Sequence, residues 1–152
     1  EIEGSEYFFK TIPEFNEMLA NGKVIEYRCY HTIHGDWYYF TADDGQIDEN
    51  HDYLVTQVLG GYENLLNYYG PERVIPIYIQ VEDGLRLSRA LERERSQEHP
   101  KYKEMCRRFI ADSEDFSEAN IERLGIVKRY ENIDFDTCLD EIISDIKAVR
   151  NA

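Results

Sequence analysis

Residues 74–109, VIPIYIQVEDGLRLSRALERERSQEHPKYKEMCRRF, join a short apolar run to two charged segments of helical length. The apolar run at 74–81 has the length and composition of a buried strand. The charged segments at 83–98 and 101–117 predict two helices that are separated near Pro100. A buried strand followed by helices is typical of an α/β fold with a mostly parallel sheet.

The segments on both sides of this stretch repeat the same alternation. Upstream, residues 53–58 predict a second buried strand, and residues 60–71 predict a helix. Downstream, residues 125–130 predict a weaker strand. An amphipathic helix is predicted from Asp136 onward. Its apolar residues at helical spacing are Leu139, Ile142, Ile143, Ile146 and Val149.

The first 41 residues predict a helix and a separate small β-element. Thr11 and Glu14 have the spacing of a capping box, so a helix is expected to begin there and to end near Gly22. Residues 23–41 are rich in β-branched and aromatic side chains and contain a turn signal at Gly35. They predict two strands joined by a loop.

Composition limits the classes of function. A length of 152 residues predicts one domain, and a net charge of −14 argues against nucleic-acid or anionic-membrane partners. No apolar run approaches the length of about 20 residues that spans a bilayer. Three scattered cysteines, at positions 29, 106 and 138, favour a reducing, cytoplasmic location. The chain opens on Glu1 without an initiator Met, and we expect a segment to precede it; the sequence carries no sign of oligomeric state.

Basic residues gather in one window of this acidic chain. Residues 86–108 hold eight of the 17 Lys and Arg residues. In a helix over 83–98, Arg86, Arg89 and Arg93 share one face. One interpretation is a solvated face, since Glu82 can pair with Arg86. The other is an anion site, because the planar guanidinium group binds phosphate in a bidentate manner.

The order of motifs along the whole chain resembles the guanylate kinase family of P-loop nucleoside monophosphate (NMP) kinases. Matching positions near the start are Glu3-Gly4…Tyr7-Phe8-Phe9, Phe15…Met18…Gly22…Glu26 and Gly35-Asp36-Trp37-Tyr38. Matching positions in the second half are Arg89…Arg93, Arg108-Phe109 and Asn132…Phe135-Asp136…Cys138. The resemblance implies one guanylate-kinase-like domain over 1–152 that lacks its N-terminal P-loop segment. Residues 23–41 would form its NMP-binding β-element and 83–117 its arginine-bearing lid.

The resemblance also implies roles for individual residues. Tyr7 and Tyr38 would hydrogen-bond the phosphate of the acceptor nucleotide, and Glu26 would accept hydrogen bonds from a guanine base. The catalytic positions implied in the lid are Arg89, Arg93 and Arg108. The expected ligands are ATP with Mg²⁺, bound mainly by a segment absent from this chain, and an acceptor NMP, with GMP first. Without the resemblance, Tyr7 and Tyr38 are equally compatible with core aromatics.

The sequence departs from the family pattern at three places. It contains no G-x-x-x-x-G-K-[ST] loop for the ATP phosphates, so we expect this chain alone to be inactive. Tyr39-Phe40 stands where the family has a small G-[ST] pair, which leaves Thr41 to supply the hydroxyl. Acidic residues of the family strand at 54–61 are replaced, depending on register, by Thr56, Gln57 or Val58.

These departures keep a second interpretation open. Guanylate-kinase-like domains of scaffold proteins bind phosphorylated or helical peptides and do not catalyse phosphoryl transfer, and this chain could be such a binding module. A metal is not expected: His31, His34 and Asp36 lie close in sequence, but no cysteine or further carboxylate stands at a recognised ligand spacing.

Overall fold

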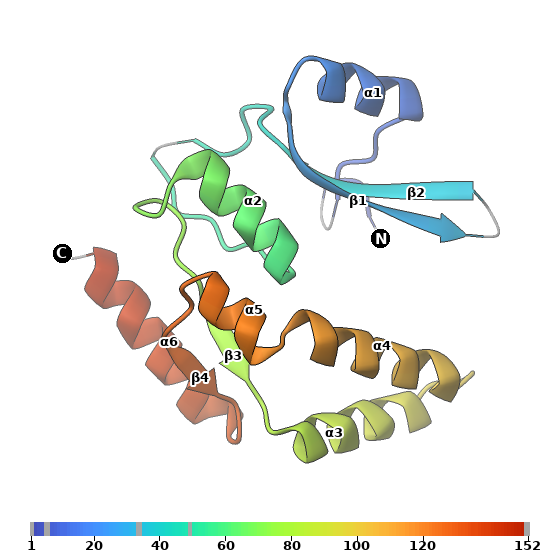
Figure 1. Cartoon of the computed structure of the whole chain (residues 1–152), viewed down its shortest axis with the longest axis vertical. Coiled ribbons are helices and arrows are strands. Elements are labelled where there is room, and N and C mark those ends of the chain that lie inside the picture. The colour runs from blue at the N-terminus through green and yellow to red at the C-terminus, as the bar shows by residue number, and fades with distance from the viewer. Residues whose placement is uncertain (1, 5–6, 33–34, 49, 151–152) are drawn as a thin grey trace. The chain divides into compact units, whose positions relative to one another are not determined.

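The computed structural model describes residues 2–4, 7–32, 35–48 and 50–150. Within these ranges the protein is a mixed α/β structure with six helices and two small sheets (Figure 1). One sheet is an antiparallel hairpin, β1–β2, and the other is a parallel pair, β3–β4. The chain divides into two compact units, residues 1–74 and 75–152, and each is described by itself.

The first unit begins with helix α1, Ile12–Ala20, as the capping box predicted. The Thr11 hydroxyl accepts from the Glu14 backbone N–H, and the Glu14 carboxylate accepts from the Thr11 N–H at 2.7 Å. Gly22 follows the helix with a φ of 68°, a conformation that a residue without a Cβ adopts freely. The start and end of α1 are therefore set by local sequence.

Strands β1, Val24–Thr32, and β2, Gly35–Ala42, form the predicted hairpin. Its register pairs Glu26 with Thr41 and Cys29 with Tyr38. Because side chains alternate along a strand, the hairpin has two faces. Phe15 of α1, only 4% exposed, packs against one face, which carries Tyr27, Cys29, Tyr38 and Phe40. The other face carries Glu26, Arg28, Tyr39 and Thr41.

The predicted strand at 53–58 is not formed. This segment pairs with no strand in the described part of the chain, and Leu54 is 87% exposed. An apolar run becomes a buried strand only where a neighbouring strand accepts its backbone hydrogen bonds. Here the run is extended coil that leads into helix α2, Leu59–Tyr69, which buries Leu59 and Leu65 and ends at Gly70.

The second unit contains a short parallel pair linked by helices. Strands β3, Tyr78–Gln80, and β4, Arg129–Glu131, pair with Ile79 opposite Tyr130. The predicted strand at 74–81 is thus shortened to three residues. The connection between the two strands contains helices α3 (Asp83–Arg95) and α4 (Tyr102–Asp115). It also contains a short helix that we did not predict, α5 (Glu118–Arg123). Helix α6 (Phe135–Arg150) follows β4.

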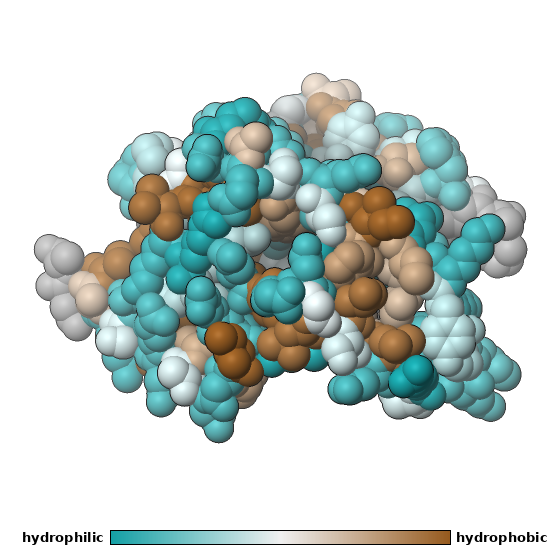
Figure 2. Space-filling view, turned by 60° about the horizontal axis from the view of Figure 1, so that its bottom comes forward, coloured by the Kyte–Doolittle hydropathy of each residue, from teal (hydrophilic) through white to brown (hydrophobic). Residues whose placement is uncertain are grey.

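The core of the second unit lies around α5 and β4. Its buried residues are Ile121, Leu124, Ile126, Tyr130 and Cys138. The apolar stripe of α6 is less buried than its helical spacing predicted, since Leu139, Ile143 and Ile146 stay about 40% exposed. Figure 2 shows hydrophobic side chains, in brown, spread among hydrophilic ones on the face that it presents. No helix in the described ranges has the length and apolar character needed to cross a bilayer.

Candidate binding sites on the two units

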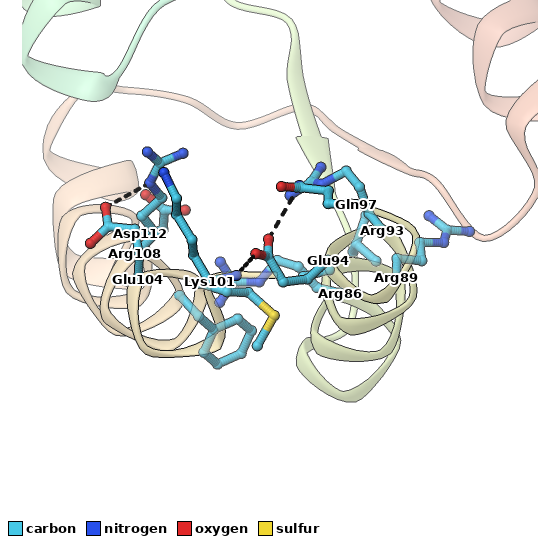
Figure 3. A pocket seen from close by; sticks show the side chains of 13 residues that line it. Arg86, Arg89, Arg93, Glu94, Gln97, Lys101, Glu104, Arg108 and Asp112 are labelled. Atoms are coloured by element: carbon cyan, nitrogen blue, oxygen red, sulfur yellow. Dashed lines mark hydrogen bonds and ion pairs between the residues drawn. The ribbon is translucent and has the colours of Figure 1, made fainter. Parts of the chain in front are cut away.

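Helices α3 and α4 of the second unit enclose a cavity of about 690 Å³, which we call the arginine cavity. The positively charged residues that line it are Arg86, Arg89, Arg93, Lys101 and Arg108, and the negatively charged ones are Glu94, Glu104 and Asp112. Positive side chains outnumber carboxylates, and the volume is in the range of small-ligand pockets. All three arginines predicted to be catalytic line this one cavity (Figure 3).

Two arginines of α3 are engaged in contacts that hold the unit together. Arg86 donates to Ser113 Oγ of α4 at 2.6 Å, and its guanidinium lies 4.1 Å from the centroid of the Phe109 ring. Arg89 donates to the backbone carbonyls of Asn132 and Ile133 at 2.8 and 2.9 Å. In Figure 3 the Arg89 side chain points away from Lys101. Arg89 therefore fixes the segment before α6.

Arg93 differs from these two. Within the described residues its exposed guanidinium has no hydrogen bond or ion pair, although it lines the cavity. The ammonium group of Lys101 also lines the cavity and has no hydrogen bond or ion pair within the described residues. Unpaired cations gathered on a concave surface are the arrangement that binds a phosphate group.

Among the residues that the structure describes, Arg108 is held through one nitrogen of its guanidinium group. Its Nε donates to Glu104 Oε1 at 2.9 Å, while Arg107 donates to both oxygens of the same carboxylate at 2.8 and 2.7 Å. The bonds from Arg107 and then Arg108 lower the pKa of Glu104 to about 2. Glu104 thus positions Arg108 at the cavity and leaves its terminal guanidinium nitrogens available.

Glu94 forms part of the cavity wall. It is 9% exposed, and it accepts from the Gln97 side-chain amide at 3.3 Å and from the backbone N–H of Lys101 (Figure 3). Lys101 is the N-cap residue of α4, where the helix dipole favours a negative group. This contact fixes the connection between α3 and α4, and with it the spacing of the cavity walls.

The first unit contains a polar cluster around a buried carboxylate. Glu26 is 5% exposed and is the hydrogen-bond acceptor for Thr41 Oγ1 at 2.7 Å and for Gln57 Nε2 at 3.2 Å. Arg28 completes what we call the Glu26 cluster, since its Nε lies 3.7 Å from Glu26 Oε2. A buried carboxyl group costs free energy unless polar partners of this kind surround it.

The Glu26 cluster is not fully satisfied within the described residues. The buried Nε of Arg28 has no hydrogen-bond partner, because 3.7 Å is an ion-pair distance and too long for a hydrogen bond. Both hydrogen bonds to Glu26 go to Oε1. One carboxylate oxygen and one guanidinium N–H therefore lack a hydrogen-bond partner within the described residues.

Tyr7 and Tyr38 lie near the hairpin but not together with Glu26. Both line a second cavity, of about 440 Å³, to which Glu26 does not contribute. Tyr38 stacks on Phe15 with ring centroids 4.8 Å apart. Its neighbour Tyr39 points to the other face, where its ring meets that of Tyr7 edge-on at 5.3 Å. Of the two neighbours Tyr38 and Tyr39, it is therefore Tyr39 that shares a hairpin face with Glu26.

Three residues of these sites were not singled out from the sequence. Lys101 has no motif of its own. Gln57 was one of three alternatives in the sequence, and the structure shows that Gln57 contacts Glu26. The alternation of the strand, counted from Glu26 through the turn, could have identified Tyr39, but the turn length was not known. His34 lies outside the described residues. No family model matches this chain, and no curated protein matches its sequence.

Proposed function

We propose that this chain is the acceptor-binding and lid portion of a guanylate-kinase-like NMP kinase. In this reaction an oxygen of the GMP phosphate attacks the γ-phosphorus of ATP. A new P–O bond forms, the bond to the ADP oxygen breaks, and GDP and ADP result. Mg²⁺ bound together with ATP, mainly by a segment absent from this chain, would neutralise charge on the phosphates. The predicted sheet would be the mostly parallel sheet of that fold, and β3–β4 is a parallel pair consistent with it.

The Glu26 cluster is the observation that carries the proposal. A guanine base offers two adjacent N–H donors, on N1 and on the exocyclic amine, and a carboxylate accepts from both. Glu26 is buried and held by Thr41, and its Oε2 receives no hydrogen bond within the described residues. A buried acceptor of this kind discriminates strongly, because a base without the matching donors leaves it unpaired.

The ring contact between Tyr7 and Tyr39 of the hairpin supports a phosphate-binding role. We assign the phosphate-binding role to Tyr7 and Tyr39, because their rings are in contact and Tyr39 shares the face of Glu26. Tyr38 was the residue implied by the family motif, and its packing on Phe15 favours a structural role. Assigning this role to Tyr39 instead of Tyr38 keeps the same phosphate-binding group, since both side chains carry a phenolic hydroxyl.

The arginine cavity supports the lid role. Phosphoryl transfer depends mainly on positioning and on stabilising charge on the transferred group. Arg93 and Arg108 line the cavity with guanidinium nitrogens that have no partner in the described part of the chain, and we assign these two arginines to this charge. Arg89 is assigned to positioning, because both of its bonds go to backbone carbonyls.

The test is nucleotide binding by the 152-residue chain, measured by calorimetry with GMP, IMP and AMP. IMP lacks the exocyclic amine and AMP lacks both donors, so we expect affinity to fall in that order. Glu26→Gln should weaken GMP binding by about 10- to 100-fold, the effect of one hydrogen bond to a charged group.

The matched pair Tyr38→Phe and Tyr39→Phe separates the two faces of the hairpin. We expect Tyr39→Phe to weaken GMP binding and Tyr38→Phe to leave it nearly unchanged. Equal affinity for GMP and AMP, or GMP binding that is unaffected by Glu26→Gln, would contradict the proposal.

A peptide-binding module is the second candidate. It is favoured by Gln57, an uncharged residue where the family carries an acidic one, and by the bulky Tyr39-Phe40 pair. In that case a phosphoserine peptide would bind to the unsubstituted chain even in excess GMP, and Arg93→Ala would remove this binding. GMP itself would not bind. The same calorimetric titrations with a phosphopeptide distinguish the two functions.

A further inference from the structure

Strands β1 and β2 bring together three side chains of types that commonly bind metal ions. The thiol of Cys29, an imidazole nitrogen of His31 and a carboxylate oxygen of Asp36 all lie within 4.8 Å of one another. Among the described residues no other group of three His, Cys, Asp or Glu side chains converges in this way. The sequence prediction considered His31 and Asp36 but left Cys29 out.

The strand register explains why the three meet. Cys29 and His31 are two residues apart on β1, so their side chains point to the same face. Asp36 is the cross-strand partner of His31, and directly opposed residues have neighbouring side chains. Two hydrogen-bonded strands therefore supply the ligands, and the backbone pairing fixes their spacing.

The surroundings leave this group accessible. The side chains of His31 and Asp36 are 83% and 48% exposed, and their facing atoms, Nδ1 and Oδ1, are 2.6 Å apart. Cys29 is a free, half-buried thiol. A cation can approach from solvent without any rearrangement of the core.

The three donors match the preferences of Zn²⁺. Thiolate, imidazole and carboxylate are its protein ligands, with bonds of about 2.3, 2.0 and 2.0 Å, so tetrahedral donors stand about 3.3–3.5 Å apart. The His31 and Asp36 donors need to separate by less than about 1 Å, which exposed side chains achieve by rotation. A mixed S, N, O set also disfavours Mg²⁺ and Ca²⁺, which take oxygen ligands.

A second His–Asp pair in the same unit shows what the cysteine adds. His51 Nδ1 lies 2.9 Å from Asp48 Oδ1, much like the His31–Asp36 pair. No third ligand converges there among the residues that the structure describes. His51 and Asp48 form an ordinary hydrogen-bonded pair, which provides a control within the same chain.

We propose that Cys29, His31 and Asp36 bind one Zn²⁺ ion on the β1–β2 hairpin, with the fourth position open to water or another ligand. The ion would join the two strands next to the turn and would stabilise the hairpin in proportion to its occupancy. This inference does not depend on the proposed nucleotide binding.

The test is a titration of the metal-free, reduced 152-residue chain with Co²⁺, a spectroscopic substitute for Zn²⁺. We expect one equivalent to produce a thiolate-to-metal charge-transfer absorption together with the visible bands of tetrahedral Co²⁺, and Zn²⁺ to displace it. Cys29→Ser should abolish the charge-transfer band. His31→Ala and Asp36→Asn should each weaken Zn²⁺ binding more than about 10-fold, since even changes outside the ligand shell give losses of about 10- to 100-fold.

Matched controls keep the result specific to this site. Cys106→Ser removes an exposed thiol elsewhere, and His51→Ala removes the comparison pair, so both variants should keep the full signal. Circular dichroism checks that each variant is folded. The proposal is overturned if the unsubstituted chain gives no charge-transfer band, if Cys29→Ser retains it, or if Cys106→Ser or His51→Ala loses it.

Discussion

The Thr41 hydroxyl donates a 2.7 Å hydrogen bond to Glu26 Oε1 across the paired strands β1 and β2. Because Glu26 is 5% exposed, removal of this donor leaves a buried carboxylate with less compensation. Thr41→Val keeps the shape of the side chain and removes the hydroxyl. We expect it to lower the free energy of unfolding by about 1–3 kcal/mol, measured by urea denaturation.

Thr56→Val is the matched control for this substitution, because Thr56 is exposed and makes no side-chain hydrogen bond within the described residues. Its effect should stay within about 0.5 kcal/mol. If the two substitutions change stability equally, the Thr41–Glu26 bond is not an important contact.

Arg89 and Arg93 lie on one helix, but substitution of Arg89 should lower stability far more than substitution of Arg93. Arg89→Ala removes two bonds to the carbonyls before α6, so we expect a loss of about 1–2 kcal/mol in unfolding free energy. Arg93→Ala removes no described contact and should change stability by less than about 0.5 kcal/mol.

For anion binding we expect the larger loss from substitution of Arg93 and the smaller loss from substitution of Arg89. In a titration with inorganic pyrophosphate followed by NMR, Arg93→Ala should weaken binding by about 10-fold, as expected for a charged hydrogen bond. Arg89→Ala should retain most of it. Loss of pyrophosphate binding only in Arg89→Ala would reverse the roles that we assign.

Stability should depend on Glu104 at acid pH. Its pKa is about 2 in the folded protein against 4.5 as the ordinary value, so the folded state favours the ionised carboxylate. The resulting stabilisation is complete above pH 4.5 and is lost as the pH falls toward 2. We therefore expect the difference in Tm between the unsubstituted chain and Glu104→Gln to shrink over that interval.

Salt provides an independent check on this effect. The Glu104 carboxylate with Arg107 and Arg108 is solvent-exposed, so added salt should reduce the Tm difference between the two proteins. Other carboxylates titrate in both proteins and cancel in the comparison. A Tm difference that stays constant from neutral pH to pH 2 would show that the ion pairs do not contribute.

Phe15 holds α1 on the hairpin. It is 4% exposed, and its ring centroid lies 5.5, 4.8 and 5.0 Å from those of Tyr27, Tyr38 and Phe40. Phe15→Ala should lower unfolding free energy by about 3–5 kcal/mol, as for other buried aromatics. Phe8→Ala, at a position 53% exposed, should have a much smaller effect in the same denaturation experiment.

Phosphoryl transfer by this chain alone should not exceed background. The 152 residues include no G-x-x-x-x-G-K-[ST] loop, so nothing in them cradles the β- and γ-phosphates of ATP. In a GMP-dependent ADP-release assay we expect the rate of a heat-denatured sample. A higher rate that is abolished by Arg93→Ala would show that the chain binds ATP by other means.

Local features of the structure could be predicted well from the sequence. The capping box of Thr11 and Glu14 sets the start of α1, and the helical spacing after Asp136 sets α6, because both depend on residues within one or two helical turns. The hairpin was likewise signalled by strand-forming residues around Gly35. The excess of arginines at 86–108 was visible in the sequence, and the anion site that it suggested stays a prediction.

The tertiary structure decided what depends on distant partners. Whether 53–58 becomes a strand depends on a neighbour, and within the described residues none pairs with it. Whether Tyr38 or Tyr39 faces Glu26 depends on the strand register, since a shift of one residue exchanges the faces. Register also brought Cys29 to His31 and Asp36. Folding of the second unit tied Arg89 to backbone carbonyls and left the Arg93 guanidinium without a partner among the described residues. Sequence alone thus determined the elements with local causes, and long-range pairing determined which side chains meet.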